Sequence, residues 1–101
     1  MNQMQQMIIQ MQKAQRELQK AQAAFAEKEF KINKAGLVDI VVLGSKEIVS
    51  INVEEDGFEP DNKEMIEDLI KDGLNELFAQ IDEEYAQIEE KIAGKAGGFG
   101  F

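Results

Sequence analysis

The amino-acid sequence predicts an α+β fold: a long helix, a three-stranded antiparallel meander, and a long C-terminal helix. Two stretches, one near each end, carry apolar residues at spacings of three and four, which is typical of helices. Between them lies a segment rich in Val and Ile, residues that favour strands. The chain has 101 residues, the size of one domain. We therefore expect a single domain over residues 1–93, followed by a flexible Gly-rich tail over 94–101.

The first apolar stretch is a heptad-like seam close to the N-terminus. The residues between its members are mostly Gln, Lys, Arg and Glu, all good helix formers. The pattern predicts a helix over residues 2–27, roughly 37 Å long at 1.5 Å per residue. Such a seam packs either within the chain or against another copy. Its members are Met4, Met7, Met11, Ala14, Leu18, Ala21 and Phe25.

The central segment divides into three short strands. Residues 29–33, 37–43 and 47–53 are predicted strands, separated by a turn over 33–36 and a second turn at Gly44-Ser45. A Gly at the first central position suits a two-residue type II′ hairpin turn. The acidic stretch over 54–60 is predicted to be a loop.

A second helix is expected over residues 61–93. Asp61, with Glu64 three residues later, resembles a capping box. Gly73 lies inside this helix, where Gly is unfavourable, so we expect a close approach to the sheet or to a partner. The later apolar residues form a second seam: Leu74, Phe78, Ile81, Tyr85, Ile88 and Ile92.

The two predicted helices are longer than the sheet, whose strands span only about 20 Å. Two sustained seams therefore expose more apolar surface than one small domain covers, and monomers rarely tolerate large apolar patches. We predict an obligate homodimer; a monomer whose two helices pack together is the alternative. The predicted interface residues are Met4, Met7, Met11, Leu18, Leu74, Phe78, Ile81, Tyr85 and Ile88.

The composition argues against catalysis. The chain has no Cys and no His, and its only Ser residues are Ser45 and Ser50. Disulfides, thiol nucleophiles, serine triads and the usual zinc sites are therefore excluded. We expect no enzymatic activity, cofactor, metal or small-molecule substrate. The N-terminus lacks the features of a signal peptide and no apolar run is long enough to span a bilayer, so we expect a cytoplasmic protein with no membrane partner.

The formal net charge is −9, but it is distributed unevenly. Residues 1–34 carry a net charge of +3, whereas residues 35–101 carry −12. Lys13, Arg16 and Lys20 are spaced to share one face of the first helix. We predict that they contact DNA phosphates, with an extension along Lys28, Lys31 and Lys34. The alternative is a solvated face whose charges pair with the acidic second helix.

The sequence resembles the YbaB/EbfC family of bacterial nucleoid-associated proteins over nearly the whole chain. The resemblance rests on the Met/Gln-rich N-terminal helix, on Ala35-Gly36-Leu37-Val38 entering a hairpin with Gly44, on the acidic loop with the segment Lys63-Glu64-Met65-Ile66-Glu67-Asp68-Leu69, on Asn75 and on the Gly-rich tail. It implies small homodimers that bind DNA, with paired helices projecting like the arms of tweezers, and no catalytic activity.

The residues and the resemblance together predict a nucleoid-associated homodimer that binds double-stranded DNA with low sequence specificity and affects gene expression. No aromatic residues interleave with the basic ones, so contacts to the DNA backbone are expected instead of base stacking. The alternative function is an acidic dimeric protein-interaction module that does not bind DNA. Neutralisation of the basic helix positions by Glu83, Glu84, Glu89 or Glu90 would favour this alternative.

Overall fold

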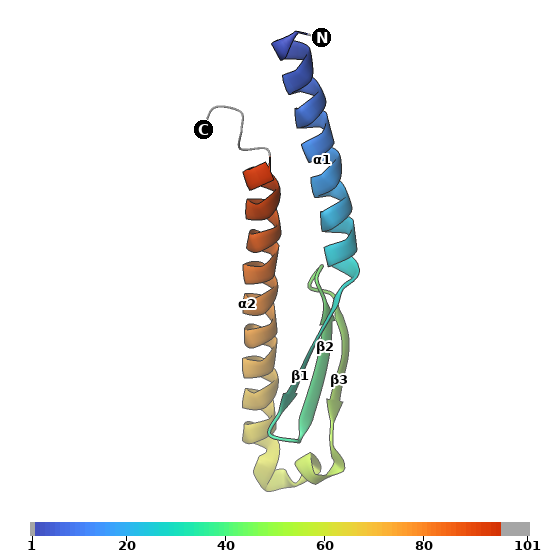
Figure 1. The fold of residues 1–101 in the computed structure, drawn as a ribbon. Coiled ribbons are helices and arrows are strands. Elements are labelled where there is room, and N and C mark those ends of the chain that lie inside the picture. Colours follow the sequence, from blue (N-terminus) through green and yellow to red (C-terminus); the bar gives the residue numbers. More distant parts are fainter. Residues whose placement is uncertain (1, 96–101) are drawn as a thin grey trace.

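The structure is a computed structural model that describes residues 2–95. Its helices and strands follow the predicted order, and the α+β class is confirmed (Figure 1). The elements are α1 (Gln3–Glu27), β1 (Glu29–Lys34), β2 (Val38–Leu43), β3 (Ile48–Val53), two short 3₁₀ helices (Glu55–Phe58 and Pro60–Asn62) and α2 (Lys63–Lys95).

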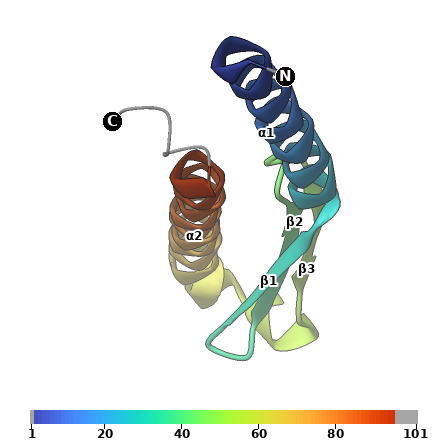
Figure 2. The ribbon, with the colours of Figure 1, turned by 45° about the horizontal axis from the view of Figure 1, so that its top comes forward.

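The three strands form one antiparallel sheet in the order β1-β2-β3. Helix α2 runs along one face of this sheet and contacts β1 and β2, so β3 is the strand farthest from it (Figures 1 and 2). Helix α1 leaves the end of the sheet, lies beside the C-terminal part of α2 and extends past its end. The molecule is correspondingly elongated, with principal extents of 71 × 21 × 14 Å. No helix in the described part of the chain is both long and apolar enough to cross a membrane.

The hydrophobic core lies between α2 and the sheet and reaches the last turns of α1. Alternate residues of β2 are fully buried, as expected for a strand with one covered face. The Phe25 ring packs edge-on against Phe30 at a centroid distance of 5.6 Å, which joins α1 to the sheet. The buried core residues are Phe25, Phe30, Val38, Ile40, Val42, Leu77 and Ile81.

Gly73 lies where α2 passes close to the sheet. A Cβ atom at this position would lie 2.8 Å from Cδ1 of Ile40, which is closer than real contacts allow. The close approach expected from this glycine is therefore confirmed, and the sheet is what approaches it.

The β2–β3 turn differs from the predicted type II′ turn. The residue with positive φ is Lys46, at 73°, and not Gly44. The N–H of Leu43 donates to the carbonyl of Glu47, and the N–H of Lys46 donates to the carbonyl of Leu43, which encloses a three-residue loop. Gly44 is needed for another reason: a Cβ there would collide with the backbone carbonyl of Phe25.

The second helix also differs from its predicted start. Asp61 lies within the 3₁₀ helix Pro60–Asn62, and α2 begins two residues later, at Lys63, directly from that turn. The acidic segment before it folds into a 3₁₀ helix, Glu55–Phe58, over part of the predicted loop. At its other end α2 continues to Lys95, past the predicted boundary at residue 93. The rest of the expected flexible tail lies outside the described residues.

Candidate nucleic-acid interface

Helix α1 carries the predicted basic stripe, Lys13, Arg16 and Lys20. Asn2 fixes the start of this helix, because its side chain accepts from the backbone of Gln5 while the Gln5 side chain accepts from the backbone of Asn2. All three basic side chains are exposed. At 100° per residue the three positions fall within about 60° of one another around the helix. The structure therefore places them together on one side of α1.

The surroundings of the stripe test the alternative interpretation, in which these charges pair with the acidic second helix. Among the residues that the structure describes, no ion pair joins Lys13, Arg16 or Lys20 to the acidic side chains of α2. The N-terminal part of α1 extends past the end of α2 (Figure 1), and every residue from 2 to 13 is exposed. The stripe is thus open to an incoming phosphate.

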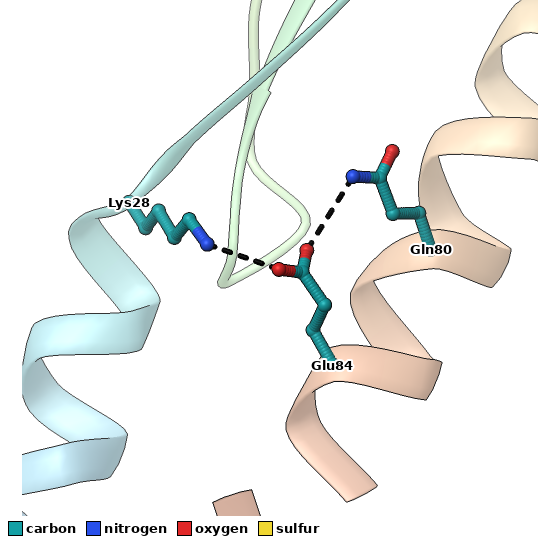
Figure 3. Close-up of polar contacts among 3 residues, drawn as sticks. All are labelled: Lys28, Gln80 and Glu84. Carbon is teal, nitrogen blue, oxygen red and sulfur yellow. Dashed lines mark hydrogen bonds and ion pairs between the residues drawn. The ribbon is translucent and has the colours of Figure 1, made fainter. Parts of the chain in front are cut away.

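The predicted extension of the stripe is placed differently. Lys28 forms an ion pair with Glu84 at 3.0 Å, and Glu84 also accepts from the Gln80 side-chain amide at 3.5 Å (Figure 3). Lys34 forms an ion pair with Glu76, also at 3.0 Å. These two lysines therefore pair with the acidic second helix, as the alternative interpretation expects for charges on this face.

Lys31 is the remaining member of the predicted extension. It is exposed, and strand alternation places it on the face of β1 opposite to the buried Phe30. This is the sheet face that α2 does not cover. The structure therefore does not gather the six predicted basic residues into one patch: three lie together on α1, two face α2, and Lys31 lies on the outer face of the sheet.

Sequence reasoning missed one basic residue beside the stripe, Lys91 of α2. Lys20 and Lys91 line the same groove between the two helices, a hollow of about 360 Å³ that also includes Glu17. Towards the sheet, Lys91 and Lys28 line a neighbouring hollow of about 580 Å³. A signal for Lys91 was present in the sequence, because it directly precedes Ile92 of the second seam and so flanks that seam.

The residues predicted for the dimer interface fall into two groups. Met4, Met7 and Met11 are exposed on the projecting part of α1, and Leu18 is half-buried. The members from α2 pack onto the core of their own chain, and Ile81 is only 2% exposed. The methionines are thus the part of the predicted helix interface that remains most accessible to a second copy.

An exposed basic helix projecting from a small sheet defines a candidate DNA-binding protein of the α+β class. The chain belongs to the YbaB/EbfC DNA-binding family, whose sequence profile matches residues 1–96.

Individual relatives agree with this assignment. A nucleoid-associated protein of Clostridium novyi is 42% identical over 86 residues, which cover 84% of this chain and 75% of the relative. One from Alkaliphilus metalliredigens is 34% identical over 89 residues, covering 87% and 78%. Another, from Mycoplasmopsis pulmonis, is 35% identical over 86 residues, covering 85% of each chain.

Proposed function

We propose that the chain is a nucleoid-associated protein that binds double-stranded DNA as a homodimer, with low sequence specificity, through Lys13, Arg16 and Lys20. The observation that carries this proposal is the exposure of the three cations on one side of α1, without an ion pair to α2 among the described residues. Membership of a DNA-binding family, with relatives named nucleoid-associated proteins, supports it.

The chemistry of the stripe favours backbone recognition. Lys and Arg neutralise phosphates, and such contacts position a protein on DNA without reading its sequence. The chain as a whole carries −9, so DNA must approach along α1 and not along the acidic α2. Released counterions then drive binding, and affinity falls steeply with salt.

A homodimer would double the stripe. Two-fold symmetry gives a second copy of the same three cations, and two linked sites bind one duplex more tightly than either alone if both can reach it. The exposed Met4, Met7 and Met11 are the predicted helix contact between copies.

The proposal is tested with a triple variant in which Lys13, Arg16 and Lys20 are replaced by Gln. A control replaces Lys46, Lys63 and Lys71, which lie outside α1, and changes the net charge equally. Because Lys46 pairs with Asp82 at 2.8 Å, circular dichroism checks that this control stays folded. Fluorescence anisotropy with a generic duplex should show loss of binding in the α1 variant and much smaller weakening in the control. Equal weakening in both would mean that only total charge matters, and the site assignment would fail.

The alternative function, an acidic protein-interaction module, has one structural observation in its favour. Lys28 and Lys34 are already paired with carboxylates of α2 and so offer little charge to DNA. This alternative predicts that neither triple variant changes duplex binding, because the unmodified protein would not bind DNA at low salt.

A further inference from the structure

Three methionines share one side of the projecting part of α1. Met4, Met7 and Met11 follow one another at intervals of three and four residues, so at 100° per residue they fall within about 60° of one another around the helix. Residues at these intervals have Cβ atoms about 5–6 Å apart. A methionine side chain has three rotatable bonds, so neighbouring thioether sulfurs on such a face can turn towards one point.

The chain leaves this methionine face open. The exposed fractions of Met4, Met7 and Met11 are 70%, 46% and 58%, and the N-terminal part of α1 extends past the end of α2 (Figure 1). Met65, at 41%, is the other exposed methionine among the described residues. It belongs to the first turn of α2, which lies at the opposite end of the molecule from the start of α1 (Figure 1). Three accessible thioethers are therefore neighbours on α1, and a fourth lies far from them.

The ligand chemistry of the methionine face is soft and uncharged. Thioether sulfur binds soft ions such as Cu(I), whereas carboxylates suit Mg²⁺ and Ca²⁺, and Zn²⁺ prefers thiolate, imidazole and carboxylate ligands. The chain has no Cys and no His, and its first acidic residue is Glu17. No group of His, Cys, Asp or Glu within the described part of the chain could hold a metal ion. The face therefore offers a soft ion three ligands of its preferred type, without harder ligands beside them.

Charge favours a monovalent ion at this face. Neutral thioethers do not offset the charge of a bound ion, so the cost of removing the ion from water rises with its charge. The basic stripe lies on the other side of α1, on average about 170° around the helix from the methionines. Lys13, Arg16 and Lys20 therefore do not crowd the ion, and DNA can occupy the stripe while the methionines hold it.

We propose that Met4, Met7 and Met11 form a binding site for one soft monovalent cation, Cu(I), for which Ag(I) is the redox-stable analogue. The inference goes beyond the proposed function, because it needs neither DNA nor a dimer: one chain supplies all three ligands. It departs from the expectation, drawn from the absence of Cys and His, that the chain holds no metal. Met7 is the central ligand, since it lies one interval from each of the other two.

The test compares two Met→Leu substitutions. Leucine keeps the apolar surface and the helix propensity of methionine but has no sulfur. Met7→Leu removes the central ligand, whereas Met65→Leu removes one partly exposed thioether elsewhere. Calorimetric titration with Ag(I) in chloride-free buffer should find one ion per chain in the unmodified protein and in Met65→Leu. We expect Met7→Leu to weaken binding at least about tenfold, because only two soft ligands remain, and circular dichroism checks that each variant is folded.

Nuclear magnetic resonance identifies the ligands directly. In protein labelled with carbon-13 at the methionine methyl groups, Ag(I) should shift the signals of Met4, Met7 and Met11 together and leave that of Met65 in place. Cu(I) added without oxygen should move the same three signals. Zn²⁺ should move none of them, because the face lacks the ligands that zinc prefers.

Two results would overturn the inference. Equal Ag(I) binding by Met7→Leu and the unmodified protein, or methyl shifts that include Met65, would mean that exposed thioethers bind the ion one at a time. No binding at all would mean that the methionine face is closed to the ion, as when a second copy covers it. Neither result touches the proposed function, because duplex binding is measured without metal. Loss of duplex binding on substitution of the basic stripe would in turn leave Ag(I) binding unchanged.

Discussion

Lys28 has two partners within its own chain. Its Nζ atom lies 3.0 Å from Glu84 and 5.0 Å from the centre of the Phe30 ring. We expect Glu84→Gln to release this cation and to raise duplex affinity at low salt several-fold. The free energy of unfolding should fall by less than about 1 kcal/mol, because the pair is partly exposed. Anisotropy titrations and urea unfolding measure the two effects.

Glu83→Gln is the matched control for this change. It removes the same charge from the adjacent position of α2, which is exposed and forms no ion pair in the described residues. If both variants bind DNA equally well, the gain comes from net charge alone and Lys28 takes no part.

Gly44 is predicted to be intolerant of any side chain. A Cβ atom there would collide with the Phe25 carbonyl, which belongs to the backbone and cannot swing away. We expect Gly44→Ala to lower the free energy of unfolding by about 1–3 kcal/mol, as overpacking does. Urea unfolding followed by circular dichroism measures the change.

Gly94→Ala provides the comparison for Gly44→Ala. Gly94 lies in α2 with open space where its Cβ would be, so the substitution should be neutral or stabilising by up to about 1 kcal/mol. If Gly44→Ala behaved like Gly94→Ala, the close approach of α1 to the β2–β3 turn would be wrong.

At the scale of elements, α1 has two parts with different surroundings. Phe25 is buried and Leu18 half-buried, whereas every residue from 2 to 13 is exposed. An isolated helix of about a dozen residues is marginally stable in water. In a chain whose methionines are not covered by a second copy, we therefore expect amide hydrogens over residues 6–13 to exchange much faster than those over residues 19–25, in hydrogen exchange followed by mass spectrometry.

Hydrogen exchange also tests whether a second copy covers the methionines of α1. Slow exchange over residues 6–13 in the free protein would mean that a second copy already covers Met7 and Met11, as the predicted helix contact requires. Addition of duplex DNA should slow exchange around Lys13, Arg16 and Lys20 if they bind phosphate.

The local pattern of the sequence predicts the elements well. The seam from Met4 to Phe25 predicted a helix over 2–27, and α1 spans Gln3–Glu27. The spacing of the apolar residues could not show which part of that seam is buried, because burial depends on where α2 ends beside α1. The type II′ turn predicted at Gly44 was wrong for a similar reason. Gly44 is required by its close approach to the backbone carbonyl of Phe25, which is a contact between distant parts of the chain.

The candidate site, too, could be predicted from the sequence only where it depends on local spacing. The spacing of Lys13, Arg16 and Lys20 was sufficient to place them on one side of a helix. The pairing of Lys28 with Glu84 joins residues 56 positions apart, so no local pattern carries it. The position of Lys91 beside the second seam is visible in the sequence, but the groove that it shares with Lys20 forms only through the packing of α2 against α1.

At the scale of the whole molecule, opposite charges are segregated along an elongated body. Three exposed basic residues lie together on α1, which projects from the sheet, while the acidic excess follows α2. This separation lets a chain of net charge −9 approach a polyanion, provided that contact is confined to the projecting helices. Such binding depends on ionic strength more than on DNA sequence.

The most direct test of DNA binding through α1 is a titration of the purified protein against a generic duplex at several salt concentrations. Three cations per copy and two copies predict six phosphate contacts, and therefore a slope of about −5 for the logarithm of the binding constant against that of salt concentration. A second duplex of unrelated sequence should bind with similar affinity. No binding at low salt, or binding that does not weaken as salt is added, would contradict the account.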